Sequence, residues 1–266
     1  MSQHQERFEF AKELARRGGK STLDYFRSNR YTVEKKTDRS PVTIADKNAE
    51  RMMRSEIGNR FPTDAIVGEE FGADQGGSDY RWIIDPIDGT KSFICGVPLY
   101  GTMVGLEYQN VCIAGAVFFP ALNEAIYAMK DEGCFHQIGD QPAVAAKVSN
   151  CQSFSEAVMV TSEVETFDDA DSSEVYKALE AGSYVSRTWG DCYGYMLVAT
   201  GRVGLMIDPV LSIWDAAAVK PIVEEAGGVF VDWSGQPRID SGSAIGCCPG
   251  IYDEVMALLK RHRSPK

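Results

Sequence analysis

The stretch from residue 80 to residue 93 decides the fold, and it reads YRWIIDPIDGTKSF. Aromatic and β-branched residues dominate its first five positions, which predicts a short buried strand that ends at Asp85. Asp88 follows, and Gly89 and Thr90 are then placed to begin a helix. Oxygen ligands for a hard cation thus lie beside backbone N–H groups that can hold an anion, which indicates a metal-dependent phosphate site. Taken alone, the two acids are explained equally well by turn chemistry.

The composition is that of an ordinary globular protein. At 266 residues and 44% hydrophobic content, the chain can bury one large core or two closely packed ones. Its formal charge of −11 argues against nucleic acid or an anionic membrane as a partner, because both would repel an acidic surface. The amino-terminal residues lack the apolar core of a signal peptide, and the longest apolar run, residues 111–122, is too short to span a membrane. The seven cysteines lack CxxC spacing and fit reduced thiols, so we expect a cytoplasmic protein.

Histidine is scarce, which limits the possible chemistry. The chain has three histidines, His4, His136 and His262, so few residues could serve as the base of a Ser-His-Asp or Cys-His mechanism. The sequence also lacks GxSxG, GxxxxGK[ST], and a GxGxxG placed between a strand and a helix. The chemistry must therefore use carboxylates, hydroxyls, amides and a metal.

The first half of the chain is predicted to contain helices followed by a largely antiparallel sheet. Apolar residues recur at a mostly helical spacing over residues 8–29, which predicts one amphipathic helix or a helix pair, because Gly18 and Gly19 should loosen the middle. A polar connector follows over residues 33–42, and Thr43 then has the place of a helix cap. The elements expected after it are a helix to residue 60, a glycine-rich loop over 72–78, and strands over 65–67, 80–84, 100–108, 111–119, 125–129 and 133–137.

Past about residue 147 short strands and helices alternate, which predicts a second sheet covered by helices. The strands are expected over residues 157–161, 184–186, 203–207, 229–232 and 244–247, and the helices over 171–181, 193–200, 214–226 and 251–262. The chain lacks a flexible linker between its halves, so we expect two packed subdomains, residues 1–147 and 148–266, with a cleft between them.

Other acids stand at the ends of predicted elements in the same way. Glu69 and Glu70 come directly after the strand over residues 65–67, and Asp46 lies in the first turn of a predicted helix. Asp215 lies at the start of another helix, after a tryptophan. Locally, compensation of the helix dipole explains Asp46 and a helix cap explains Asp215.

Together these acids resemble the signature blocks of the inositol monophosphatase family. The blocks are Glu69-Glu70 after a glycine, the run DPIDGT from residue 85, and Trp214-Asp215 before a helix that ends in Gly-Gly. The similarity extends from residue 46 to residue 228. It implies a layered α-β-α-β-α sandwich of the carbohydrate-phosphatase type and a magnesium-dependent phosphomonoesterase that forms a homodimer and is inhibited by lithium.

The resemblance also implies a set of ligands for two to three Mg²⁺ ions. Glu69, Asp85 and the carbonyl of Ile87 would hold one ion, whereas Asp85, Asp88 and Asp215 would hold a second. A third, looser ion would lie near Glu69. Four carboxylates that converge in a cleft repel one another unless cations neutralise them, so the mapping is physically consistent. Residues 1–147 would then carry most of the metal ligands, and residues 148–266 would complete the metal and substrate site.

The mechanism implied by the resemblance uses a metal-activated water. This water would lie between Glu69 and Thr90 and attack phosphorus in line. Asp46 would orient Thr90, and the backbone N–H groups of Gly89 and Thr90 would bind phosphoryl oxygens. The metal near Asp215 would stabilise the leaving alkoxide.

The second half contains the residues expected to select the phosphate ester. Within RTWGDCYGY, residues 187–195, the Gly-Asp-Cys-Tyr run is similar to the family branch that hydrolyses L-histidinol phosphate in histidine biosynthesis. The segments Lys91–Ile94 and Thr161-Ser162 favour the same branch. Histidinol phosphate carries an ammonium group and an imidazole, which extra carboxylates would hold, and Asp191 and Asp208 are the candidates.

Three alternatives stay open at this point. Asp191 is also explained as a helix cap before Tyr193, and Trp189 is bulky for its position. The substrate is alternatively inositol monophosphate or another small phosphate ester. A third possibility is a non-catalytic protein that binds a metal or a phosphosugar, but such a protein would be expected to lack one of the metal-binding acids or Thr90.

Overall fold

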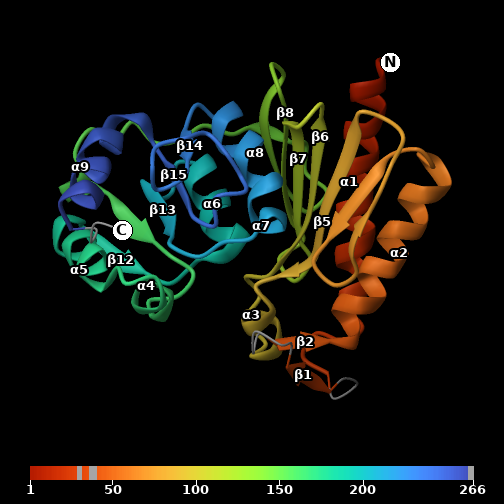
Figure 1. The fold of residues 1–266 in the computed structure, drawn as a ribbon, viewed down its shortest axis with the longest axis horizontal. Coiled ribbons are helices and arrows are strands. Elements are labelled where there is room, and N and C mark those ends of the chain that lie inside the picture. The colour runs from red at the N-terminus through yellow and green to blue at the C-terminus, as the bar shows by residue number, and fades with distance from the viewer. Residues whose placement is uncertain (29–31, 36–40, 263–266) are drawn as a thin grey trace.

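The computed structural model describes residues 1–28, 32–35 and 41–262. These residues form layers in the order helix, sheet, helix, sheet, helix (Figure 1). One outer layer holds α1 (Gln3–Thr22) and α2 (Ile44–Arg60), which contact the first sheet. The middle layer holds α6 (Asp191–Ala199), α7 (Ile213–Ala217) and α8 (Val219–Glu225). The other outer layer holds α4 (Glu165–Asp169), α5 (Ser173–Gly182) and α9 (Tyr252–His262). The expected α-β-α-β-α sandwich is confirmed.

The first sheet is eight-stranded, in the order β10-β9-β8-β7-β6-β5-β3-β4. Its neighbours pair antiparallel except β3 and β5, which are parallel. The turn between β6 and β7 has Gln109 and Asn110 at φ 51° and 62°, the left-handed backbone that a tight hairpin requires. The strands are β3 (Ala65–Gly68), β4 (Gly72–Asp74), β5 (Tyr80–Asp88), β6 (Gly101–Tyr108), β7 (Val111–Phe119), β8 (Glu124–Met129), β9 (Gly133–Ile138) and β10 (Val144–Ala145).

The second sheet is five-stranded and mixed, in the order β12-β11-β13-β15-β14. β11 pairs parallel with β12 and β13, and β15 pairs antiparallel with β13 and β14. The alternation predicted for the second half of the chain is therefore confirmed. The strands are β11 (Val158–Val160), β12 (Val185–Arg187), β13 (Leu205–Asp208), β14 (Val229–Val231) and β15 (Ala244–Cys247), and the 3₁₀ turns are η1 (Phe154–Glu156) and η2 (Pro249–Ile251).

Buried apolar side chains fill the spaces between the layers. Met53 and Trp82 lie in the cluster between the first helical layer and the first sheet. Met103 and Ile222 lie in the cluster between the two sheets, and Phe167 lies in the cluster beyond the second sheet. Because the middle cluster contains residues from both halves of the chain, the elements that carry the candidate site pack on a shared core.

Several predicted elements differ from those observed. β5 continues past Asp85 to Asp88, and the irregular pairing between these residues accommodates Pro86 within the strand. The single helix predicted over residues 214–226 is two helices, α7 and α8. The break precedes Pro221, which lacks the N–H that a continuous helix would need.

The amino-terminal region also differs in detail. α1 begins at Gln3, because Ser2 accepts a hydrogen bond from the N–H of Gln5 (3.1 Å), and it ends at Thr22. The helix is continuous through Gly18 and Gly19, so the prediction that they loosen it is wrong. A Cβ on either glycine would lie within 2.8 Å of Met53 or Phe118, which shows why small residues are needed there.

Two segments expected to be irregular contain short strands. The predicted connector over residues 33–42 contains β1 (Val33–Lys35) and β2 (Pro41–Thr43), which pair antiparallel, and β4 lies within the predicted loop over residues 72–78. Residues 36–40 and Asn29, the expected end of the first helix, lie outside the described residues. Within the described residues, no helix is both long enough and apolar enough to cross a membrane.

Candidate active site

The end of β5 places two acids beside the start of a short helix. The N–H of Ile87 donates to Oδ1 of Asp85 (2.9 Å), which fixes that carboxylate against the irregular part of the strand. Gly89 has φ 84°, a left-handed conformation that allows the chain to turn from β5 into α3 (Thr90–Ile94). Asp85 and Asp88 are both buried at this turn.

Asp215 joins these two acids from the middle helical layer. Asp85, Asp88 and Asp215 each offer an oxygen, and these oxygens lie within 4.8 Å of one another. Asp215 is the third residue of α7, and its Oδ2 accepts a hydrogen bond from the N–H of Ser212 (2.8 Å). Ser212, not Asp215, has the N-cap position of α7, and Asp215 instead supplies the acid of the capping box three residues later. This contact is compatible with the cluster because a carboxylate has two oxygens.

The electrostatics of this cluster favour a bound cation. Burial raises the pKa of Asp85 and of Asp88, and neighbouring carboxylates raise both further. Desolvation raises the pKa of Asp215 to about 7. In the part of the chain that the structure describes, none of the three is ion-paired with a lysine or arginine. Oxygen donors without a protein counter-charge are the set that Mg²⁺ prefers, so the residues present fit the metal that the family resemblance implies.

Glu69 lies close enough to act on several of these acids. It follows β3 directly, and its charge raises the pKa of Asp85, of Asp215 and of Asp46 after the larger effect of desolvation. Because β3 and β5 pair parallel, with Gly68 opposite Ile84, Glu69 lies at the same end of the sheet as Asp85. Its role as a metal ligand, like that of the Ile87 carbonyl, stays a prediction.

Asp46 and Thr90 are neighbours, as expected. The hydroxyl of Thr90 lies 3.4 Å from Oδ1 of Asp46 and 3.1 Å from the carbonyl oxygen of Ile87, and its one proton serves either acceptor. Oδ2 of Asp46 accepts from the backbone N–H of Thr43 (2.8 Å) and from its hydroxyl (2.6 Å). Asp46 is fully buried, and burial raises its pKa. The residue therefore both caps α2 and contacts Thr90.

Asp191 faces the cluster from the first residue of α6. Its backbone has φ 53°, and its N–H donates to the hydroxyl of Ser162 (2.9 Å). A Cβ built on Gly89 would lie 2.8 Å from Oδ2 of Asp191, so this carboxylate lies against the turn after β5. Desolvation raises the pKa of Asp191 to about 7. Gly190, not Asp191, has the N-cap position of α6, so the interpretation of Asp191 as a helix cap is wrong.

Asp208 has its hydrogen-bond partners within the protein. It ends β13 and is buried. Its Oδ1 accepts from the N–H of Ser162 (3.0 Å) and the hydroxyl of Thr161 (3.2 Å), and its Oδ2 accepts from the hydroxyl of Tyr195 (3.4 Å). Burial raises the pKa of Asp208 to about 6. This carboxylate holds the Ser162 turn, and Ser162 in turn holds Asp191.

Two contacts at the site were not predicted from the sequence, although both residues lie in segments that the sequence analysis singled out. The N–H of Cys192, in the first turn of α6, donates to Oδ2 of Asp88, although the two residues are far apart in the chain. Lys91, directly after Thr90, is ion-paired with Glu163, which follows Ser162. A glycine before a helix start predicts backbone N–H groups that are available at that helix end. The sequence does not predict which acid accepts their hydrogen bonds.

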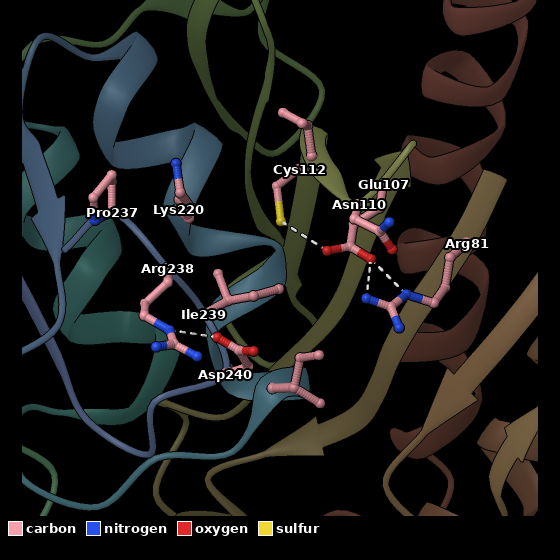
Figure 2. A pocket seen from close by; sticks show the side chains of 11 residues that line it. Arg81, Glu107, Asn110, Cys112, Lys220, Pro237, Arg238, Ile239 and Asp240 are labelled. Atoms are coloured by element: carbon pink, nitrogen blue, oxygen red, sulfur yellow. Dashed lines mark hydrogen bonds and ion pairs between the residues drawn. The ribbon is translucent and has the colours of Figure 1, made fainter. Parts of the chain in front are cut away.

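A separate cavity of about 450 Å³ lies at the opposite end of β5 (Figure 2). Its lining includes Arg81, which is ion-paired with Glu107, and Arg238, which is ion-paired with Asp240. Because these charged groups already pair with one another, the cavity differs from the acidic cluster, whose charges are unbalanced.

The fold and the acidic cluster define the class of the protein. The layered sandwich is also the fold of solved inositol monophosphatases, and the family match together with the histidinol-phosphatase relatives identifies a phosphoric monoester hydrolase. The chain belongs to the inositol monophosphatase family, because the model of that family matches residues 3–263. The family identified from the sequence motifs is thus confirmed.

Individual relatives and solved structures agree with this assignment. The chain is 45% identical to a histidinol-phosphatase from Chlorobaculum parvum over 89% of this chain and 90% of that protein. It is 36% identical to a histidinol-phosphatase from Streptomyces coelicolor over 93% and 94% of the two chains. Its structure is similar to an inositol monophosphatase from Zymomonas mobilis, with a TM-score of 0.84, 27% identity, and 98% and 100% of the chains covered. An IMPase from Thermotoga maritima gives a TM-score of 0.84 at 31% identity, with 96% and 97% covered.

Proposed function

We propose that this protein is a magnesium-dependent phosphatase that hydrolyses L-histidinol phosphate to histidinol and phosphate, as part of cytoplasmic histidine biosynthesis. The names of the relatives from Chlorobaculum parvum and Streptomyces coelicolor support this substrate. The structural observation that carries the proposal is the Asp191 carboxylate, which lies against Gly89 beside the acidic cluster. An anionic group in that place is suited to a phosphate ester that also carries a cation.

The proposed metal ligands divide into overlapping sets. Glu69, Asp85 and the carbonyl of Ile87 would hold one Mg²⁺, Asp85, Asp88 and Asp215 a second, and the region of Glu69 a third, looser ion. When bound, Mg²⁺ supplies Lewis-acid stabilisation of the phosphoryl group and lowers the pKa of water. The supporting observations are the close approach of the cluster oxygens and the raised pKa values of its acids.

The protein groups around the metal ligands would orient the reactants. In one orientation of its hydroxyl, Thr90 donates a hydrogen bond to Asp46. The oxygen of Thr90 can then accept a hydrogen bond from a water. The backbone N–H groups of Gly89 and Thr90 would hold phosphoryl oxygens. Their place beside Asp88 supports this role, because a phosphate held there would adjoin the cluster.

The second half of the chain would recognise the rest of the substrate. Asp191 would pair with the ammonium group or the protonated imidazole of histidinol phosphate. Asp208 would act through Ser162, which it holds and which holds Asp191. We further propose that residues 1–147 and 148–266 are two subdomains that share the site, and that the protein is a homodimer.

Inositol monophosphate is the second candidate substrate, favoured by the solved inositol monophosphatase from Zymomonas mobilis. The two candidates differ in charge, because the inositol ring is neutral whereas histidinol carries an ammonium group. A carboxylate at position 191 should therefore help one substrate and leave the other unaffected.

The test measures phosphate release from L-histidinol phosphate and from myo-inositol 1-phosphate with saturating Mg²⁺. We expect wild-type kcat/KM to favour histidinol phosphate by about a hundredfold, which corresponds to roughly 3 kcal/mol. Asp191→Asn should remove most of this preference, because it should lower kcat/KM for histidinol phosphate and leave kcat/KM for inositol phosphate unchanged. Asparagine keeps the shape of the side chain and tolerates the left-handed backbone at φ 53°.

Asp131→Asn is the matched control, because Asp131 is also left-handed, at φ 65°, but lies exposed in the β8–β9 turn. It should leave both activities unchanged. A wild-type enzyme that prefers inositol phosphate, or a preference that persists in Asp191→Asn, would contradict the assignment of Asp191.

A further inference from the structure

Glu50 is a buried acid that the proposed mechanism does not use. It lies on α2, four residues and so about one helical turn after Asp46, and its side chain is fully buried. Its Oε2 accepts a hydrogen bond from the N–H of Glu70 (2.7 Å), and its Oε1 accepts from the N–H of Phe71 (3.2 Å). Both N–H groups belong to the turn between β3 and β4 that carries Glu69. A side chain from a helix thus holds the backbone next to a proposed metal ligand.

The contact between α2 and this turn is close and is held at both ends. A Cβ on Gly68 would lie 2.2 Å from Oε1 of Glu50, so a larger residue has no room there. Arg54, one turn further along α2, donates from Nε to Oε1 of Glu50 (2.7 Å). The same guanidinium is ion-paired with Asp74 (2.9 Å) and donates to the carbonyl of Gly72. The Glu50–Arg54 pair therefore fixes the beginning and the end of the turn.

The negative charge of Glu50 strengthens its hydrogen bonds to the N–H groups of Glu70 and Phe71. A carboxylate taken out of water is costly unless it is paired and hydrogen-bonded, and Glu50 has both an arginine and two backbone donors. Hydrogen bonds to an ionised acceptor are about twice as strong as neutral ones. The turn is consequently held by α2 rather than by its own residues alone.

Asp46 and Glu50 lie on one face of α2, and each holds a different part of the site. Asp46 contacts the hydroxyl of Thr90, whereas Glu50 holds the backbone beside Glu69. We infer that Glu50 is a positioning residue that fixes Glu69 relative to Thr90 and thereby sets the affinity of the metal site. This inference rests on the proposed role of Glu69 as a metal ligand, and it does not depend on which phosphate ester is hydrolysed.

The test measures Mg²⁺ binding to the metal-free protein by titration calorimetry, without substrate. Glu50→Gln is expected to raise the Kd for Mg²⁺ by about tenfold to a hundredfold, the usual cost of losing a group that holds a metal ligand in place. Turnover should fall at limiting Mg²⁺ and recover in part when Mg²⁺ is saturating, because the ligands themselves are intact.

Asp64→Asn is the matched control. Asp64 is a buried carboxylate directly before β3, at the other end of the strand from Glu69, and it accepts hydrogen bonds from Arg7, Ser78 and Trp82. This variant should lower the melting temperature of the protein and leave its Kd for Mg²⁺ unchanged. Equal weakening of Mg²⁺ binding in both variants would overturn the inference, since the effect would then be general destabilisation.

Glu69→Gln separates the inference from the proposed function. Weaker Mg²⁺ binding in Glu69→Gln with wild-type binding in Glu50→Gln would overturn the positioning role and keep the metal site. Wild-type binding in Glu69→Gln would overturn both. Should Glu50→Gln fail to fold, Arg54→Lys and Gly68→Ala disturb the same contact from its other sides. Wild-type Mg²⁺ affinity in folded protein of either variant would likewise overturn the inference.

Discussion

Asp88→Asn is expected to lower kcat for phosphate release by about a thousandfold, roughly 4 kcal/mol of activation free energy. The substitution removes an anionic oxygen from the proposed second metal site, where Asp85 and Asp215 lie close by. It should not unfold the protein. Burial and then the charge of Asp191 raise the pKa of Asp88, so the ionised carboxylate is repelled by its surroundings when metal is absent. The amide oxygen of asparagine still accepts from the N–H of Cys192.

The measurement combines steady-state phosphate release at saturating Mg²⁺ with thermal melting in EDTA. In EDTA, Asp88→Asn should melt at the wild-type temperature or above it. Asp232→Asn is the control, because Asp232 is a buried acid that holds its own turn through the N–H groups of Ser234 (2.7 Å) and Gln236 (2.9 Å). Asp232→Asn should lower the melting temperature and leave kcat unchanged. Wild-type turnover in Asp88→Asn would refute the assignment of Asp88 as a ligand.

Much of the fold could be predicted because the local patterns are clear. Thr43 and Asp46 form a capping box at the start of α2, and both residues could be recognised by their spacing in the sequence. The alternation of elements after residue 147 predicts helices on a second sheet. Asp88 ends β5, Asp85 lies three residues before that end, and Asp215 lies in the first turn of α7, so each acid is close to the boundary of an element. The convergence of Asp85, Asp88 and Asp215 within 4.8 Å then depends on the layers, which no local pattern describes.

The parts that could not be predicted depend on contacts between distant segments. β5 reaches Asp88 because that residue pairs with Gly101 across the sheet, whereas Pro86 locally argues for an earlier end. α6 begins at Asp191 because that residue adopts a left-handed backbone held by Ser162, not because of apolar spacing. Glu50 gives no local signal either, since a glutamate within a helix is ordinarily on the solvated face.

The expected roles of the two recognition acids differ for a similar reason. Both Asp191 and Asp208 are predicted from the sequence to bind the substrate, because carboxylates would hold the ammonium group and the imidazole of histidinol phosphate. In the structure Asp208 is surrounded by donors from Thr161, Ser162 and Tyr195. Asp191 lies against Gly89 instead. Only three-dimensional contacts distinguish Asp191, which lies against the turn after β5, from Asp208, which holds its neighbours.

Removal of the metal is expected to abolish phosphate release, with a loss of at least about a thousandfold, and Mg²⁺ should restore it. Without a cation the acidic cluster also makes the stability of the protein depend on pH. Desolvation raises the pKa of Asp215 and of Asp191 to about 7, and the pKa values of Asp85 and Asp88 are raised as well. An unfolded aspartate has a pKa of about 3.9.

The direction of the pH effect follows from these values. The folded metal-free chain holds its protons more tightly than the unfolded chain, so these acids favour folding at low pH. Their contribution is complete below a pH of about 4 and is lost as the pH rises through about 7. In EDTA the melting temperature should therefore fall between about pH 5 and pH 8.

Bound Mg²⁺ should remove that fall, because it neutralises the carboxylates as they ionise. Thermal melts across this pH range, in EDTA and in saturating Mg²⁺, test this expectation. In EDTA the melting temperature of Asp88→Asn should depend less on pH, because this variant has one acid fewer. Full phosphate release after exhaustive chelation, or a melting temperature in EDTA that rises with pH, would contradict a cation-dependent cluster. The activity and stability measurements thus test the same carboxylates independently, since melting needs no substrate and turnover needs no change of pH.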